Sequence, residues 1–170
     1  MSDGASFASF VDAHSRTLFG TAYLLTGTTP AAEDLVQETL AMLYPKWERV
    51  LAAQAPVAYV RRALTNVYLS GRRARGGHDI AMWDLPDATA AGDVAESVVN
   101  RDHLWQLLGS LSERQRAAIV LKYFHAMADA DIASTLGCRV ATVRSLISRG
   151  VADMREQSSP TVNGMRGGRS

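Results

Sequence analysis

The stretch that decides the fold is DIASTLGCRVATVRSLI, residues 131–147, whose spacing is typical of a helix-turn-helix. Ala133 is small enough to let two helices cross closely, and Gly137 can adopt the left-handed conformation that ends the first helix. Val143 and Ile147 recur at helical spacing and are expected to pack the second helix against the first. The stretch therefore predicts two helices joined by a tight turn, over residues 129–136 and about 140–154.

The second of these helices carries polar and basic side chains that its apolar positions leave free. In a helix-turn-helix such a face enters the major groove, where arginine reads guanine and hydroxyl side chains reach phosphates or bases. A plain helical hairpin with solvated arginines is the alternative. The candidates for contact with duplex DNA are Arg139, Thr142, Arg144, Ser145 and Arg149.

The rest of the chain also shows helical spacing, and no segment alternates as a strand does. Ser112, with a glutamine three residues later, predicts a capping box at the start of the helix that precedes the helix-turn-helix. Near the N-terminus, Thr29 followed by Pro30 predicts the N-cap and first residue of a second helix. A third helix is expected to begin at Pro56, after a connector over residues 48–55.

Composition excludes several classes of protein. Hydrophobic residues make up 47% and charged residues 21%, as in ordinary globular chains. A single cysteine excludes an intrachain disulfide framework and a multi-cysteine zinc site. The chain has no apolar run of membrane-spanning length and no signal-peptide start, so we expect a cytoplasmic protein. Its four histidines lack metal-binding spacing, and no glycine motif for phosphate occurs, so neither a cofactor nor an enzymatic activity is expected.

Charge divides the chain into blocks. Residues 1–76, 101–157 and 158–170 each carry a net charge of +2, whereas residues 77–100 carry −5 and no basic side chain. Such asymmetry is compatible with nucleic-acid contact, and also with two solvated domains around a solubilising linker. We predict an all-α protein with a three-to-four-helix domain (1–76), a flexible acidic linker (77–100), a helix-turn-helix domain (101–157) and a disordered tail (158–170).

Three stretches, in this order, resemble the extracytoplasmic-function group of sigma-70-type RNA polymerase sigma factors. They are AEDLVQET at residues 32–39, YVRRALTN at residues 59–66 with Arg72 and Arg73 beyond it, and LSERQR at residues 111–116 with the helix-turn-helix that follows. The resemblance spans about residues 5–156 and points to the actinobacterial sigma-E-type branch. It implies that the two predicted domains are sigma regions 2 and 4.

The resemblance also implies roles for individual residues. The helix with Asp34, Leu35, Gln37 and Glu38 would bind core polymerase at the β′ clamp helices. Asp34, Gln37 and Glu38 share one helix face. The C-terminal domain would bind the −35 element and the β flap, and many relatives are held by an anti-sigma factor. The residues implied for single-stranded −10 DNA are Arg61, Arg62, Asn66, Arg72 and Arg73.

The function implied is that of an alternative sigma factor. Such a protein binds core RNA polymerase, recognises the −10 and −35 elements and opens the −10 DNA, while polymerase supplies the chemistry. Two other hypotheses remain open at this point. One is a stand-alone helix-turn-helix regulator of transcription, and the other is a promoter-inactive decoy that binds an anti-sigma factor.

Overall fold

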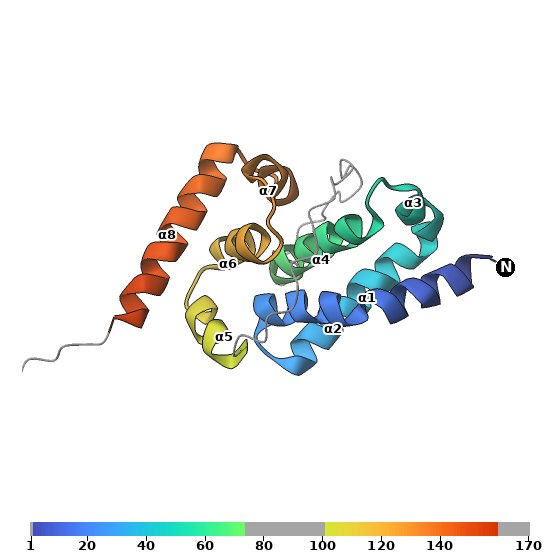
Figure 1. The fold of residues 1–170 in the computed structure, drawn as a ribbon, viewed down its shortest axis with the longest axis horizontal. Helices are drawn as coiled ribbons and strands as arrows, with labels where there is room; N and C mark the ends of the chain where they lie inside the picture. The colour runs from blue at the N-terminus through green and yellow to red at the C-terminus, as the bar shows by residue number, and fades with distance from the viewer. Residues whose placement is uncertain (1, 74–100, 160–170) are drawn as a thin grey trace, which may run out of the picture.

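The computed structural model describes residues 2–73 and 101–159, and every regular element in those ranges is helical (Figure 1). The all-α prediction is therefore confirmed. The predictions for the linker at 77–100 and for the tail beyond Ser159 lie outside the described residues. Within the described ranges, no helix is long and apolar enough to cross a bilayer.

The N-terminal half, residues 2–73, begins with a hairpin of two helices. Its elements are α1 (Ser2–Thr26), α2 (Thr29–Leu43), the 3-10 turn η1 (Tyr44–Lys46), α3 (Trp47–Ala52) and α4 (Pro56–Arg73). Gly27 turns the chain between α1 and α2 at a φ of +84°, a conformation that glycine adopts without strain. Two predictions here need correction. The N-cap of α2 is Thr28 rather than Thr29, since the Thr28 hydroxyl accepts from the Ala31 amide, and residues 48–52 are helical rather than a connector.

Aromatic and aliphatic side chains fill the core of this half. Trp47 is 2% exposed, and its indole packs edge-on against Phe7 and Phe10 from α1, with both ring centroids at 4.9 Å. Leu18 of α1 and Leu64 of α4 are fully buried in the same apolar cluster. The short α3 is therefore held by its tryptophan, because six residues would not form a stable helix alone.

The C-terminal half, residues 101–159, is the predicted helix-turn-helix with two preceding helices. Its elements are α5 (Arg101–Gly109), α6 (Glu113–Ile119), the π-helical turn η3 (Val120–Phe124), α7 (Asp129–Leu136) and α8 (Val140–Ser158). The capping box of Ser112 and Gln115 is present as predicted. Gly137 has a φ of +62° and ends α7, while the Cys138 amide donates back to the Ala133 carbonyl. Val143 is fully buried and anchors α8.

The two halves pack against each other along a surface that we call the seam. On one side lie α1 and α4, and on the other lie α5, α6, η3 and α7 (Figure 1). The buried apolar residues of both halves form one continuous cluster across it. At its edge Trp105 of α5 covers Gly27, so closely that a Cβ atom built on Gly27 would lie 1.9 Å from the indole. The sequence analysis predicted two domains and did not predict that they pack against each other along this seam.

Arg116 of α6 makes hydrogen bonds to both halves at the seam. It is only 7% exposed, and its guanidinium lies 5.6 Å from the centroid of the Trp105 ring. Two of its acceptors belong to the N-terminal half. The other three lie at the end of α5 and in the turn that leads to α6. These acceptors are the Leu25 carbonyl (2.9 Å), the Tyr68 hydroxyl (2.9 Å) and the carbonyls of Leu108 (2.9 Å), Gly109 (3.2 Å) and Leu111 (3.0 Å).

A buried histidine forms a second polar link across the seam. His125, just after η3, is 8% exposed, and its Nε2 lies 3.0 Å from the Thr21 hydroxyl of α1. The Thr21 hydroxyl has one hydrogen and donates it to the Thr17 carbonyl, so Nε2 is the donor to Thr21. Burial, and then the nearby positive charge of Arg61, lower the pKa of His125 to about 3. The closed seam therefore holds a neutral imidazole.

The substitution Gly27→Ala should loosen the seam. The added methyl group both strains a left-handed backbone and overlaps Trp105. Gly137→Ala is the matched control, because Gly137 also has a positive φ but no atom lies within 4 Å of the new methyl group. Strain alone costs about 1–2 kcal/mol, and we expect Gly27→Ala to lower the free energy of unfolding by more, with partial recovery when Trp105→Ala is added. If Gly27→Ala and Gly137→Ala lowered the free energy of unfolding equally, and Trp105→Ala restored none of it, the close packing of Trp105 on Gly27 would be contradicted.

Acidification should destabilise the closed form through His125. A group with a lowered pKa contributes stability above its unfolded value, about 6.5, and this stability is lost as the pH falls toward about 3. The free energy of unfolding can fall by up to about 1.4 kcal/mol for each pH unit in this range. Urea unfolding between pH 7.5 and 5 should show this loss in the wild type, and His125→Gln should have a flatter profile. Parallel profiles would mean that His125 is not held neutral.

Candidate nucleic-acid and polymerase interfaces

The predicted polymerase-binding face is present on α2. Asp34, Gln37 and Glu38 are all exposed on the outer side of this helix. Leu35 is only 6% exposed and points into the core. The structure thus divides the predicted set into three side chains that a partner can touch and one that holds the helix to its own domain.

The arginines predicted for −10 DNA lie in an unexpected place. On α4, Arg61 is 4% exposed and Arg62 is 2% exposed, although the sequence places both off the apolar stripe of that helix. The resemblance gave no sign of this burial. Arg62 meets the C-terminal half directly, since its Nε donates to the Thr135 hydroxyl of α7 at 2.9 Å, and Arg61 lies near enough to His125 to affect its pKa. Burial lowers the pKa of Arg62, and the charge of Asp131 on α7 opposes this shift.

The remaining predicted −10 residues follow the same helix. Asn66 is half-buried in the middle of α4, one turn beyond Arg62. Arg72 and Arg73 lie in the last turn of α4, and their side chains are not among the described parts. Their contact with DNA stays a prediction.

The predicted −35 residues form a set of exposed side chains at the start of α8. Arg139 is the N-cap residue, and its side chain makes no capping hydrogen bond. Thr142, Ser145 and Arg149 recur at three- and four-residue spacing on one side of the helix, opposite the buried Val143. Arg144 lies beside them with its side chain 72% exposed. In Figure 1, α8 runs along the outer edge of the molecule, where a DNA groove can reach it.

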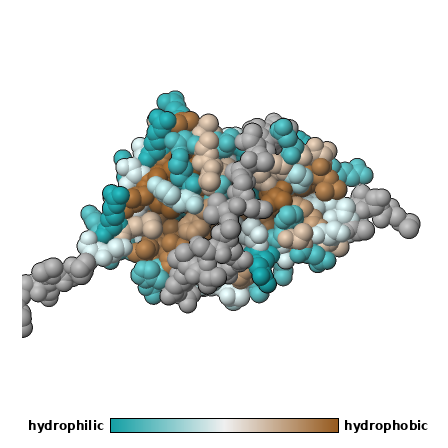
Figure 2. All heavy atoms as spheres, in the orientation of Figure 1, coloured by the Kyte–Doolittle hydropathy of each residue, from teal (hydrophilic) through white to brown (hydrophobic). Residues whose placement is uncertain are grey.

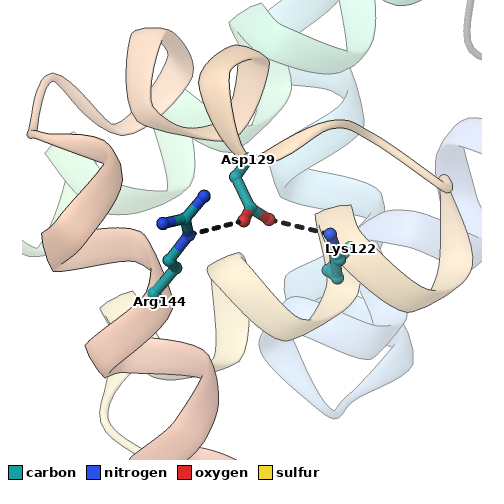
Figure 3. Close-up of polar contacts among 3 residues, drawn as sticks. All are labelled: Lys122, Asp129 and Arg144. Carbon is teal, nitrogen blue, oxygen red and sulfur yellow. Dashed lines mark hydrogen bonds and ion pairs between the residues drawn. The ribbon is translucent and has the colours of Figure 1, made fainter.

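One charged group beside this face was missed by sequence reasoning. Asp129, in the first turn of α7, accepts from Lys122 Nζ of η3 at 2.8 Å and from Arg144 Nε of α8 at 3.2 Å (Figure 3). Hydrogen bonds from Lys122 and then Arg144 lower the pKa of the Asp129 carboxyl, although its partial desolvation opposes them. The three side chains come from three elements, so no spacing within one helix reveals them.

The C-terminal half also carries an apolar hollow of about 750 Å³ between α5, α6, η3 and α8. Figure 2 shows hydrophobic residues gathered on this part of the surface, next to α8. Tyr123, at its edge, is 58% exposed. The apolar side chains that line the hollow include Leu104, Leu107, Ile119, Tyr123, Val151 and Met154.

The candidate surfaces therefore differ in access. The acidic and amide face of α2 and the polar face of α8 are exposed, whereas Arg61 and Arg62 of α4 are buried at the seam, with Arg62 bonded to α7. A chain with this arrangement can meet a protein partner or duplex DNA as it stands. It cannot bring the buried arginines to single-stranded DNA unless the seam opens.

Two sigma-70 family models match the chain, one in each half. The family model for sigma-70 region 2 matches residues 10–77, and the model for sigma-70 region 4 matches residues 101–154. The RNA polymerase sigma-E factor of Streptomyces avermitilis is 30% identical over 151 residues, which cover 89% of this chain and 84% of that protein. The factor of the same name from Streptomyces coelicolor is 29% identical over 157 residues, covering 92% and 88%.

A solved structure of sigma factor RpoE in complex with the anti-sigma factor NepR from Bartonella quintana is similar throughout. It has a TM-score of 0.67 and 25% identity, covering 94% of this chain and 99% of that one. CnrH in complex with the cytosolic domain of CnrY has a TM-score of 0.59 at 18% identity, covering 91% and 88%, and shares the fold. The chain therefore belongs to the sigma-70 family of RNA polymerase sigma factors, in the sigma-E branch of its extracytoplasmic-function group.

Proposed function

We propose that this sigma factor is held closed by its seam and that promoter opening requires the two halves to separate. The observation that carries the proposal is the burial of Arg61 and Arg62 on α4, where Arg62 is bonded to Thr135 of the C-terminal half and Arg61 lies near His125. Single-stranded DNA is bound by basic side chains that follow its backbone. Two arginines that are 4% and 2% exposed are unavailable for this role until α7 moves away from α4.

The first contact with core polymerase is made, in this proposal, by the exposed face of α2. Asp34, Gln37 and Glu38 offer carboxylate and amide groups that suit a basic partner, such as the β′ clamp helices. This face is exposed in the closed form, so polymerase can engage it before the seam opens. The apolar hollow beside α8 is the surface that we assign to the β flap, since it is a hydrophobic concavity of about 750 Å³ on the C-terminal half.

The two promoter elements are divided between the halves. Arg139, Thr142, Arg144, Ser145 and Arg149 of α8 would contact the −35 duplex, and Arg61, Arg62, Asn66, Arg72 and Arg73 of α4 would contact the −10 strand. Residues 77–100 would act as the acidic linker that allows separation between a region 2 domain (1–76) and a region 4 domain (101–157), with a tail at 158–170. The protein itself would catalyse nothing and would act in the cytoplasm with polymerase.

An anti-sigma factor is a natural partner for the closed form. The RpoE structure, solved with its anti-sigma factor, matches 94% of this chain in one superposition that includes both halves. That similarity supports the idea that an inhibitor could hold the halves as they are seen here. Such a partner would keep Arg61 and Arg62 buried.

Charge reversal on α2 should abolish transcription. The variant Asp34→Arg/Glu38→Arg places two positive charges on the proposed polymerase face, and we expect binding to core polymerase to weaken by at least about tenfold. The measurement is run-off transcription with Streptomyces core polymerase on a pool of genomic promoter fragments, together with a binding titration. Wild type should produce discrete transcripts that the variant does not.

The single reversal Glu38→Arg is compared with Asp12→Arg, an equal charge change at an exposed residue of α1. We expect the Asp12 variant to bind and transcribe as wild type does. Loss of activity in both single variants would indicate a general charge effect and contradict the assignment of α2. Binding of core polymerase without transcripts from wild type would favour a decoy, and the absence of binding would favour a stand-alone DNA-binding regulator.

A further inference from the structure

Arg144 differs from the other exposed basic residues of α8 in being held by a carboxylate. Its Nε donates to Asp129 Oδ2 at 3.2 Å, while Asp129 Oδ1 accepts from Lys122 Nζ at 2.8 Å. Among the described residues, the terminal amino groups of Arg144 have no hydrogen-bond partner. Figure 3 shows the guanidinium extended from α8 toward Asp129 at the start of α7. Its Nε lies on the dashed contact, and its two terminal nitrogens point away from the carboxylate.

This geometry leaves the two terminal amino groups of Arg144 available for a hydrogen-bond partner. An arginine reads guanine by donating two parallel hydrogen bonds, to O6 and N7. When Nε is occupied by a carboxylate, the pair of terminal amino groups remains available for such a bidentate contact. A long side chain that is 72% exposed would otherwise sample many rotamers, and ordering it on binding would weaken discrimination.

Lys122 binds the other oxygen of Asp129, so the two cations do not compete for one acceptor. Lys122 Nζ of η3 lies on Oδ1, and Arg144 Nε lies on Oδ2. The position of α7 is itself fixed from the opposite end, where Arg114 Nη2 donates to the Leu136 carbonyl at 3.1 Å. The carboxyl of Asp129 also has a lowered pKa, so it is ionised wherever DNA binding would be measured.

We propose that Asp129 is a positioning residue for promoter specificity, which orients Arg144 so that its terminal amino groups read one base pair of the −35 element. The proposal rests on the function proposed above, since it requires α8 to contact that element. Asp129 itself touches no DNA in this scheme. Its negative charge, close to the DNA backbone, would weaken binding to every sequence equally, and its benefit would appear only as discrimination.

The test measures discrimination separately from affinity. Holoenzyme is assembled with wild type or Asp129→Ala, and transcripts are counted from a promoter of this factor whose −35 element has been randomised. We expect Asp129→Ala to lose roughly tenfold in preference at one base pair, with the other positions unchanged. Arg144→Ala should lose preference at the same base pair, and adding Asp129→Ala to it should cause no further loss there.

Lys122→Gln is the matched control, because it removes the other ion pair of Asp129 but leaves the Arg144 contact in place. It should keep the preference that Asp129→Ala loses, and Asp129→Glu should restore part of that preference. A uniform change at all positions, or an equal change in Lys122→Gln and Asp129→Ala, would overturn the positioning role while leaving the sigma-factor function standing. A wild-type holoenzyme without any −35 preference would overturn both proposals.

Discussion

The closed structure depends on the hydrogen bonds of one buried side chain, the guanidinium of Arg116. A buried ion is tolerated only when its hydrogen-bonding groups are satisfied. The hydrogen bonds of Arg116 go to four backbone carbonyls and one phenol. Three of these acceptors lie at the end of α5 and just after it, and the other two belong to α1 and α4 of the N-terminal half. The position of α6 against the N-terminal half is thereby fixed. Since these acceptors are neutral, water can replace the Leu25 and Tyr68 oxygens when the halves part, and Arg116 keeps its three local bonds.

The other polar contacts of the seam share this reversible character. Arg62 meets a hydroxyl on α7, and His125 meets a hydroxyl on α1. Each of these groups can be hydrated after separation, whereas the contact of Trp105 with Gly27 is lost without replacement. The seam can therefore be stable in the free protein and still yield to polymerase, promoter DNA or both. Its opening would expose Arg61 and Arg62 of α4 in addition to the polar face of α8.

Local patterns predicted local structure well, and contacts between the halves could not be predicted. The helix-turn-helix, the capping box at Ser112 and the left-handed Gly137 all depend on residues within a few positions of one another. Arg62, in contrast, meets a partner 73 residues away, and helical periodicity marks it only as polar. Asp129 escaped notice for the same reason, because its two cations come from different elements. Gly150, unusual within a helix, is buried where an added Cβ would lie 2.6 Å from Ile119, so close packing of α8 on α6 explains it.

If the seam is closed in the free protein and open on the promoter, the distance between the two halves must increase when transcription starts. Fluorescence energy transfer tests it directly, with dyes on cysteines introduced at the exposed Ala13 of α1 and Ala152 of α8 in a Cys138→Ser background. We expect high transfer in the free protein, and a clear fall when core polymerase and a promoter are added and transcripts appear. Unchanged transfer in a transcribing complex would contradict opening of the seam, because Arg61 and Arg62 would then remain buried while the −10 DNA is open.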